Sequence, residues 1–422
     1  MSCAFSCGSA TQPSSSIPDT QRPSGGKGDF FGDDVPFADL YFSTSIEDRV
    51  WLRGRLVEED VEDIGAPTSA LGQISQDEMK NQAFEVRILD RDNKEHSLGK
   101  RKTNDEGYFD DVFDISALGL QPGRYLVTVY VDNEKAGETK TLLLDDLREK
   151  VIVRSDVDLT YLSTDFHSTS AILKLLKQSS DEKNALVGMP TLYQSLRGDD
   201  EVPITFLSGS PKFFKRVLEG KMVIDRVEQD GLVLKPLKDI SKKNILGLSW
   251  GDLLPDLKEQ VGYKLFWLLK LRTMVPNTSP EILMGDDSEA DYVVYNIYYR
   301  FLKGELTSST LEAELDKVKV STFWKNKIQE IGSSIEVGKV ALPQAIYINK
   351  TDVPGETFDI KNWIIPGITR HHKGAYPLAL DMAEENWITT EEVLNIRATM
   401  IAEGVSAQEL DESLKNADFL NL

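Results

Sequence analysis

The sequence has few of the residues that build disulfides and soft metal centres. Its 422 residues include 2 cysteines, Cys3 and Cys7, and 4 histidines that show no metal-ligand spacing. Everything after residue 7 can therefore hold neither a disulfide nor a cysteine-based zinc site. No apolar run approaches the roughly 18–20 residues of a membrane-spanning helix, so we expect no transmembrane segment.

Positive charge is also scarce. The chain has 48 Lys and Arg against 69 Asp and Glu, a formal net charge of −21. Proteins that bind nucleic acid take most of their affinity from basic surfaces, so we expect no nucleic-acid partner. Apolar residues make up 40% of the chain and charged residues 28%, as in globular domains with buried cores.

The N-terminal segment has the composition of a disordered tail. Residues 1–29 are rich in Ser, Gly and Pro and poor in apolar side chains, and we expect the tail to extend over residues 1–35. No charged stretch leads into an apolar core, so the sequence as given predicts a cytoplasmic protein. The alternative is an exported or lipid-anchored envelope protein, because residues 4–7 resemble the site before a lipidated bacterial cysteine, provided that the true start lies upstream of Cys7.

Residues 36–148 alternate apolar and polar side chains with a period of two. The pattern is clearest at 123–131 and recurs at 50–57 and 83–89. Turn-forming residues stand at 104–107 and 121–123. No helical pattern interrupts this region, so it predicts an all-β sandwich that serves as an accessory domain. Its pattern resembles immunoglobulin-like or transthyretin-like modules.

Residues 149–350 alternate short apolar strands with segments of helical period, which predicts an α/β domain with a parallel sheet. Residues 351–422 predict a helical extension packed on that domain. The expected strands are 151–153, 204–207, 282–284 and 345–348, and the expected helices are 168–177, 212–219, 264–274 and 290–302. Capping boxes at Thr389/Glu392 and Ser406/Glu409, with Gly404 between them, mark two further helices.

Two carboxylates follow the first expected strand of this domain. Asp156 and Asp158 are two residues apart, so in extended chain both point to one side at the strand's carboxyl end. Ligands of open α/β sheets bind at that end. The pair could hold a hard cation, with one member attacking an electrophile. The alternative is a solvent-exposed Asp-Val-Asp without a chemical role.

Two further segments offer groups that bind phosphate. Ser208 ends an apolar strand, and we expect Ser210 to cap a helix that begins at Pro211 and stops at Gly220. An ordinary capped helix is the alternative. Lys264 opens an apolar helix, where it could bind phosphate oxygens or lie toward solvent along its aliphatic stem.

An acidic cluster follows the third strand. Asp286, Asp287, Glu289 and Asp291 lie within six residues and repel one another unless a cation sits among them. A metal site is therefore expected here, and the alternative is an acidic first turn stabilised by the helix dipole.

Together the four segments resemble the haloacid dehalogenase superfamily. Within it they are most similar to the phosphatidate phosphatase catalytic-domain family, represented by a yeast actin-patch protein and bacterial relatives. The resemblance rests on Ser155–Thr160, Ser208–Pro211, Lys264 and Gly285–Asp291, in that order. It implies a haloacid-dehalogenase-like, Rossmann-type domain. Leu159 departs from it, since the family often has Asp at that position.

The resemblance also implies roles for individual residues. Asp156 would be the nucleophile that forms an aspartyl-phosphate, and Asp158 the acid and base. Ser208 and Lys264 would hold the phosphoryl oxygens. Mg²⁺ would be bound by Asp156, the backbone carbonyl of Asp158, Asp286 and Asp291, and substrate would lie beside Thr160, Gly209 and Ser210.

The resemblance implies a phosphatase that acts on a phosphorylated small molecule or a phospholipid headgroup, and the latter includes phosphatidate. An inactive scaffold or envelope binding module, working through its β-sandwich, is the main alternative. The partner of that sandwich cannot be inferred from the residues. A third interpretation is a serine hydrolase, because Gly247–Gly251 matches Gly-x-Ser-x-Gly and His371 or His372 could act as the base. We expect these two histidines in a polar surface turn instead.

Overall fold

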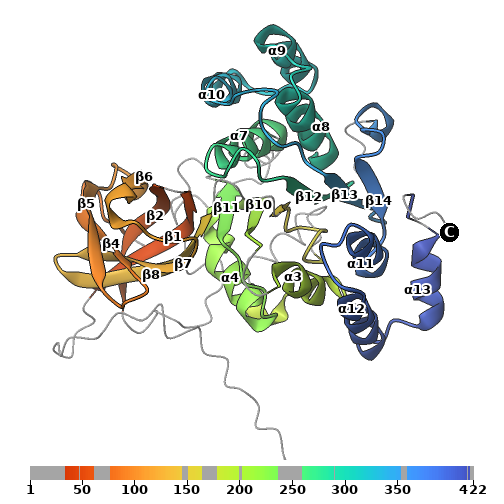
Figure 1. Cartoon of the computed structure of the whole chain (residues 1–422), viewed down its shortest axis with the longest axis horizontal. Coiled ribbons are helices and arrows are strands. Elements are labelled where there is room, and N and C mark those ends of the chain that lie inside the picture. The colour runs from red at the N-terminus through yellow and green to blue at the C-terminus, as the bar shows by residue number, and fades with distance from the viewer. Residues whose placement is uncertain are drawn as a thin grey trace, which may run out of the picture.

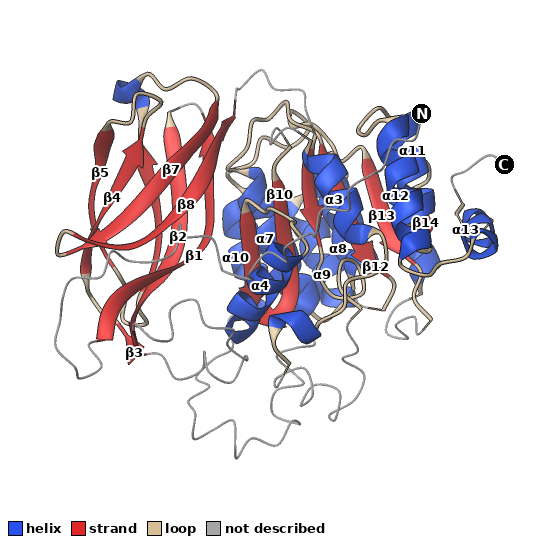
Figure 2. Cartoon of the chain, turned by 90° about the horizontal axis from the view of Figure 1, so that it is seen from below, coloured by secondary structure: helices blue, strands red, loops and turns tan. Residues whose placement is uncertain are grey.

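The chain combines an antiparallel β-module with a parallel sheet that helices cover on both faces (Figures 1 and 2). This computed structural model describes residues 34–46, 48–60, 77–144, 151–163, 178–198, 202–235, 259–288, 290–352, 359–415 and 417–418. The predicted mixed α/β class is confirmed. Outside the described residues lie Cys3, Cys7, the expected helix 168–177 and Gly247–Gly251.

The β-module comprises the described residues of 34–144. Its strands are β1 (Asp34–Ile46), β2 (Arg49–Asp60), β3 (Asp77–Glu78), β4 (Ala83–Leu89), β5 (Glu95–Lys102), β6 (Tyr108–Asp114), β7 (Gly123–Val131) and β8 (Glu134–Leu144). All pair antiparallel except β1 with β8. Alternate side chains of β2, β4 and β7 point into one apolar core, so the period-two pattern correctly predicted strands there.

The parallel part of the sheet has the order β14-β13-β12-β9-β10-β11. These strands are β9 (Ile152–Ser155), β10 (Ile204–Pro211), β11 (Gly231–Lys235), β12 (Glu281–Asp286), β13 (Ala345–Asn349) and β14 (Thr369–His372). The chain builds outward from β9 to β10 and β11, then returns to β12 on the other side of β9. Strand order therefore reverses beside β9, and a crevice for ligands forms at such a point.

Helices cover the two faces of this sheet (Figure 1). One layer contains α7 (Gln260–Arg272), α8 (Asp291–Leu302), α9 (Ser308–Lys317) and α10 (Thr322–Gly332). The other contains α3 (Met189–Arg197), α4 (Lys215–Ile224), α11 (Ala375–Glu384), α12 (Thr390–Ala402) and α13 (Ala407–Leu414). Each layer shares a large apolar core with the sheet, which is why β10 and β12 carry apolar side chains on both sides.

The expected strands of the α/β region all form, although the start of α4 differs from the expectation. Strand β10 continues through Ser210 to Pro211, and a short 3-10 helix, η4 (Lys212–Phe214), precedes α4. The predicted cap at Ser210 was wrong because its hydroxyl binds the Asp158 carboxylate. The predicted stop at Gly220 was also wrong. A Cβ there would lie 2.3 Å from Ser180 Oγ, so glycine permits close packing inside the helix.

The β-module is joined to the parallel sheet through β1 and β11. Phe42 of β1 pairs with Gly231 of β11. A Cβ on Gly231 would lie 2.7 Å from the Phe42 Cβ, so glycine is what allows the two strands to pair this closely. Phe42 also packs edge-on against Trp51 and Trp267. Ion pairs flank this contact, including Arg124 with Asp230 at 2.6 Å and Lys270 with Asp110 at 2.5 Å.

The C-terminal residues form helices as predicted, and both capping boxes are confirmed at Thr389 and Ser406. The surface turn expected at His371 and His372 was wrong. Both histidines are buried in β14, which extends the parallel sheet beyond β13. The domain boundaries at 35, 148 and 350 remain predictions.

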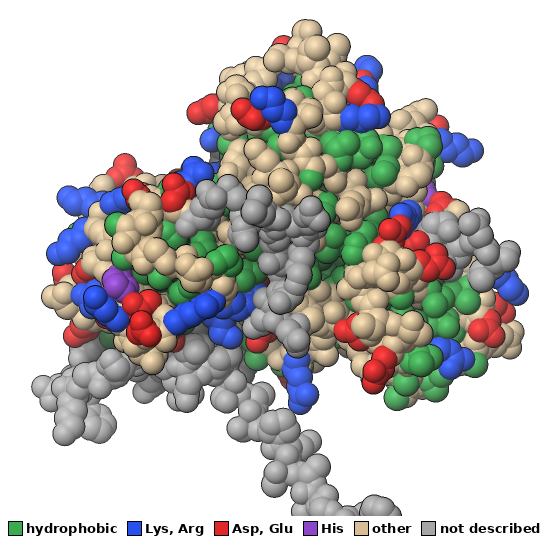
Figure 3. All heavy atoms as spheres, viewed as in Figure 1, with side chains coloured by type: hydrophobic (Ala, Val, Ile, Leu, Met, Phe, Trp, Pro, Cys, Tyr) green, Lys and Arg blue, Asp and Glu red, His purple; other side chains and the backbone are tan. Residues whose placement is uncertain are grey.

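Charged side chains of both signs are interspersed on the face drawn in Figure 3. Within the part of the chain that is described, no helix is long and apolar enough to cross a membrane.

Candidate active site

Asp156 and Asp158 lie in the loop that leaves β9, beside the reversal of strand order. The Asp156 amide donates to Met284 O of β12 over 2.8 Å, which holds the loop against the neighbouring strand. Leu159 turns the chain with φ of 55°, a left-handed conformation unusual for leucine. Asn349 Nδ2 donates to Leu159 O over 2.8 Å and supports this turn. Both aspartates are almost completely buried.

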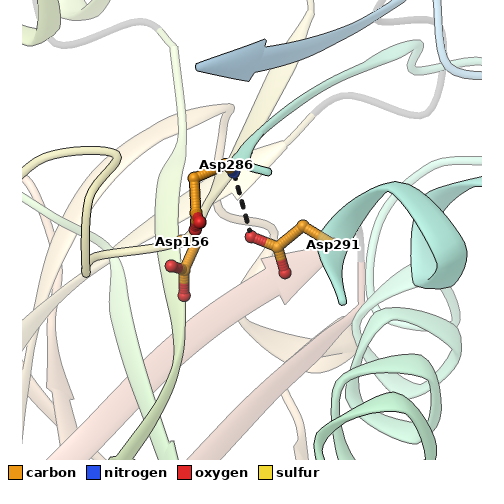
Figure 4. Close-up of side chains that lie close together, drawn as sticks. All are labelled: Asp156, Asp286 and Asp291. Carbon is orange, nitrogen blue, oxygen red and sulfur yellow. Dashed lines mark hydrogen bonds between the residues drawn. The ribbon is translucent and has the colours of Figure 1, made fainter. Parts of the chain in front are cut away.

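Three carboxylates converge next to this loop. Asp156, Asp286 and Asp291 each offer an oxygen, and these oxygens all lie within 4.8 Å of one another (Figure 4). Asp286 ends β12 and Asp291 begins α8, so two elements bring them to the end of β9. A Cβ on Gly285 would lie 2.5 Å from Asp291 Oδ2. Glycine at that position therefore lets Asp291 approach the strand end.

Lys264 supplies positive charge to this cluster. It projects from the first turns of α7 and is fully buried. Its Nζ donates to Asp156 Oδ1 over 3.0 Å and to Asp291 Oδ1 over 2.6 Å. The alternative in which Lys264 faces solvent is therefore excluded.

The second aspartate of the loop is bound by the serines of β10. Ser208 Oγ donates to Asp158 Oδ2 over 3.1 Å, and Ser210 Oγ donates to the same oxygen over 2.8 Å. The Ser210 amide in turn donates to Ser208 Oγ over 2.9 Å. Asp156 and Asp158 thus have different surroundings, one beside the other carboxylates and Lys264, the other beside two hydroxyls.

Two of the residues predicted to lie beside substrate, Thr160 and Gly209, make no side-chain hydrogen bond to the described site residues. Thr160 is buried, and its hydroxyl makes no hydrogen bond with the described residues. A Cβ on Gly209 would lie 2.9 Å from the Gln260 side chain, so glycine allows α7 to approach β10. Of the predicted site residues, the structure brings Asp156, Asp286, Asp291 and Lys264 into one group and Asp158, Ser208 and Ser210 into another.

Sequence reasoning did not single out several residues that hold the acidic cluster. The Ser288 amide donates to Asp286 Oδ1 over 2.6 Å, and the Ser288 hydroxyl also contacts this oxygen. Thr351 donates to Asp287 Oδ1 from both its amide and its hydroxyl, over 2.8 and 2.7 Å. Asp287 therefore belongs to a separate contact and is not part of the three-carboxylate cluster. A lone Ser or Thr after a strand carries no sequence signal for such a role.

Buried tyrosines of α8 lie near the three-carboxylate cluster. Tyr295 Oη donates to Met284 O over 2.8 Å. Burial and the charge of Asp291 raise its pKa well above the usual value. Burial and the charges of Asp287 and Asp286 raise the pKa of Tyr292 to about 12. Both phenols therefore stay neutral near pH 7 and contribute no further negative charge.

The donor set of the cluster suits a divalent metal. It consists of carboxylate oxygens only, which hard cations prefer over nitrogen or sulfur ligands. Lys264 brings one positive charge to three buried carboxylates, and a bound cation would offset more of their mutual repulsion. The residues present therefore fit a divalent metal ion.

Residues 151–307 match the family described as "Phosphatidate phosphatase APP1, catalytic domain". The predicted family resemblance is confirmed for this segment. It contains every residue of the candidate site discussed above except Asn349 and Thr351.

No curated protein matches the chain. Among solved structures, β-glucosidase 3B from Thermotoga neapolitana is 10% identical over 26% of this chain and 16% of its own, with a TM-score of 0.18. An immunoglobulin-like protein from Pseudomonas aeruginosa is 7% identical over 28% of this chain and 100% of its own, with a TM-score of 0.13. β-Glucuronidase 2 from Bacteroides uniformis is 9% identical, covers 84% of this chain and 39% of its own, and has a TM-score of 0.26.

The chain spans less than two thirds of the length of both glycosidases. TM-scores this low establish no shared fold, so no conclusion about fold or activity follows from these likenesses.

Proposed function

We propose that the chain is a Mg²⁺-dependent phosphomonoester hydrolase that works through an aspartyl-phosphate. The observation that carries this proposal is the buried group of Asp156, Asp286, Asp291 and Lys264 at the end of β9. The family match supports a phosphatase of the phosphatidate phosphatase type. Phosphoryl transfer depends mainly on positioning and on neutralising charge, and this group offers both.

In the first step an Asp156 carboxylate oxygen would attack phosphorus while the bond from phosphorus to the leaving oxygen breaks. Lys264 holds Asp156 and bears a fixed positive charge beside the position that the phosphoryl oxygens would take. The products of this step are the phosphorylated Asp156 and the released alcohol. Charge on a transferred phosphoryl group is best stabilised by groups already in place.

Asp158 would supply the proton for the leaving oxygen. In the second step it would take a proton from a water molecule, whose oxygen attacks the phosphorus of the phosphorylated Asp156. The bond between that phosphorus and the carboxylate oxygen then breaks, releasing inorganic phosphate and restoring Asp156. The hydroxyls of Ser208 and Ser210 orient the Asp158 carboxylate for both transfers.

Mg²⁺ would be held by Asp156, Asp286 and Asp291, with the Asp158 carbonyl as a further ligand. When bound it would supply charge neutralisation for an anionic substrate, which otherwise has to approach three carboxylates. Asp291 also binds Lys264 and the Asp286 amide, so its role would be to position the other groups.

The remaining parts of the proposal concern fold and substrate. We assign the α/β region to the haloacid-dehalogenase-like fold and the β-module to an immunoglobulin-like or transthyretin-like accessory sandwich. Support comes from the strand order around β9 and the antiparallel pairing of β1–β8. The substrate would be a phospholipid headgroup, phosphatidate being the form suggested by the family match. A phosphorylated small molecule is the alternative substrate.

The test is phosphate release from p-nitrophenyl phosphate and from phosphatidate vesicles, with Mg²⁺ and with EDTA. The wild type should release phosphate only with Mg²⁺, and Asp156→Asn should abolish release while its melting temperature stays close to that of the wild type. Asp287→Asn is the matched control, because Asp287 contacts Thr351 outside the cluster. Retained activity in Asp156→Asn would refute the mechanism. Mg²⁺ binding without any release would instead support an inactive binding module.

A further inference from the structure

Lys183 is a buried lysine that the proposed chemistry does not use. It follows the one-turn 3-10 helix η3 (Ser180–Glu182), and only 6% of its surface is exposed. Its Nζ lies 5.2 Å from the centroid of the Phe214 ring. Among the residues that the structure describes, no carboxylate lies within ion-pair distance of this Nζ.

The backbone holds Lys183 beside the catalytic loop. Leu162 bridges to Asp158 on one side and to Ala185 on the other. The Ser163 amide donates to Asn184 O over 2.9 Å. The segment that contains Lys183 is therefore fixed to the same short ribbon as Asp158, and Phe214 reaches it from the residues that follow Ser210.

Lys183 lies on the Asp158 side of the site. Burial lowers the pKa of Lys183, and attraction by the Asp158 carboxylate partly opposes that shift. Lys264, by contrast, contacts Asp156 and Asp291. Lys264 therefore lies on the side of the nucleophile, and Lys183 lies toward the proposed acid.

A buried ammonium without a close anion loses its hydration and gains little in return. The ring of Phe214 compensates only part of that loss. An anionic group of the substrate would complete the surroundings of Lys183. Since Asp158 is the proposed proton donor to the leaving oxygen, that group would belong to the leaving part of the substrate.

We propose that Lys183 forms an anion subsite that selects substrates with a second phosphate or carboxylate on the leaving group. The inference rests on the proposed function and narrows its substrate class. The same chemistry could be carried by a soluble metabolite or by a lipid with a diphosphate headgroup. A monoester with a neutral leaving group would bind through the transferred phosphoryl group alone.

Binding can be tested without turnover by titration calorimetry on the Asp156→Asn chain with Mg²⁺. The probes are glycerol bisphosphate and glycerol phosphate, which differ by the second phosphate. We expect tighter binding of the bisphosphate, and Lys183→Met should weaken it about tenfold while changing glycerol phosphate binding less than about threefold. Lys183→Arg should retain most of the preference, because it keeps the charge.

The controls separate charge from packing. Methionine keeps the aliphatic length of Lys183 over Phe214. Lys221→Met removes another buried lysine, which pairs with Asp225 at 2.7 Å on α4, and it should leave the ratio of the two affinities unchanged. Equal weakening of both ligands by Lys183→Met, or no weakening of either, would overturn the proposal.

Turnover on vesicles distinguishes the two sources of the anion. A lipid would be identified as the substrate if kcat/KM for a lipid diphosphate exceeds that for phosphatidate and Lys183→Met lowers only the former. Selectivity confined to glycerol bisphosphate would identify a soluble substrate. A wild type that releases no phosphate from any substrate would refute the proposed function, whereas the calorimetric comparison would still decide the role of Lys183.

Discussion

Asp39 of β1 and Lys215 of α4 form an ion pair of 2.8 Å across the junction between the β-module and the parallel sheet. Both side chains are buried, and Lys215 also contacts Glu219 at 2.7 Å. Together with the Phe42–Gly231 pairing, this contact makes the β-module part of the same folded body as the candidate site. Substitutions at this junction should therefore change the free energy of unfolding of the whole chain.

The two carboxylates that share Lys215 should respond differently to neutralisation. Burial raises the pKa of Glu219, whereas for Asp39 the charges of Lys215 and Arg216 outweigh burial and lower the pKa. Asp39→Asn should lower the free energy of unfolding at pH 7 by about 3 kcal/mol. Glu219→Gln, which removes a carboxylate that burial disfavours, should change it by less than about 1 kcal/mol. Urea denaturation of both variants measures the difference, and equal effects would contradict it.

The same ion pair should make the stability of the folded chain depend on pH in the acidic range. Because the pKa of Asp39 is lowered in the folded state, its stabilising effect is present above its ordinary value of 3.8 and is lost as the pH falls through the lowered value. The difference in the free energy of unfolding between the wild type and Asp39→Asn should therefore become smaller only at strongly acidic pH. A difference that already disappears near pH 6 would contradict this assignment.

Removal of Lys264 should affect both activity and metal dependence. Lys264→Met deletes the charge that contacts Asp156 and Asp291, so kcat should fall by about 10²–10³. The remaining carboxylates repel one another more strongly, so added Mg²⁺ should raise the melting temperature of this variant more than that of the wild type. Lys270→Met is a matched control on the same helix, since Lys270 pairs with Asp110 at a partly exposed position. A smaller Mg²⁺ effect in Lys264→Met would argue against a metal at the cluster.

Mg²⁺ should stabilise the folded chain through the three-carboxylate cluster. At 100 times its dissociation constant, a ligand that binds only the folded state adds about 2.7 kcal/mol. Asp286→Asn should remove most of this gain, and Asp287→Asn should keep it, because Asp287 contacts Thr351 and lies outside the cluster. Thermal unfolding with Mg²⁺ and with EDTA provides the measurement. Loss of the effect in both variants alike would place the metal elsewhere.

His372 should make the fold less stable at mildly acidic pH. Its burial in β14 lowers its pKa from 6.5 to about 4, and its Nδ1 lies 3.0 Å from Gly374 O. Between these pH values only the unfolded chain takes up the proton, so stability falls as the pH drops from 6.5 toward 4, by roughly 3 kcal/mol in total. His372→Asn should flatten this part of the pH profile in urea denaturation at pH 7 and pH 4.5. An unchanged slope would show that other groups cause it.

Much of the architecture could be predicted from local pattern. Period-two alternation located β2, β4 and β7, and apolar runs located β9, β10, β12 and β13. The capping boxes at Thr389 and Ser406 formed as expected because a cap involves residues only three positions apart. The errors at Ser210, Gly220 and the two histidines share a cause. Each residue has its main contact far away in sequence, and such a contact outweighs local preference.

By itself, the sequence determined which residue types follow each strand of the α/β region. Two aspartates follow β9, serines lie near the end of β10, a lysine lies in α7, and acids lie at and after the end of β12. Only the tertiary structure decided which of these residues contact one another. Lys264 contacts Asp156 and Asp291, and the two serines contact Asp158. The tertiary structure also bridged the segment that contains Lys183 to the loop of Asp158 through Leu162, and it joined the β-module to β11. These outcomes depend on packing between segments distant in the chain, and such packing leaves no local periodicity in a sequence.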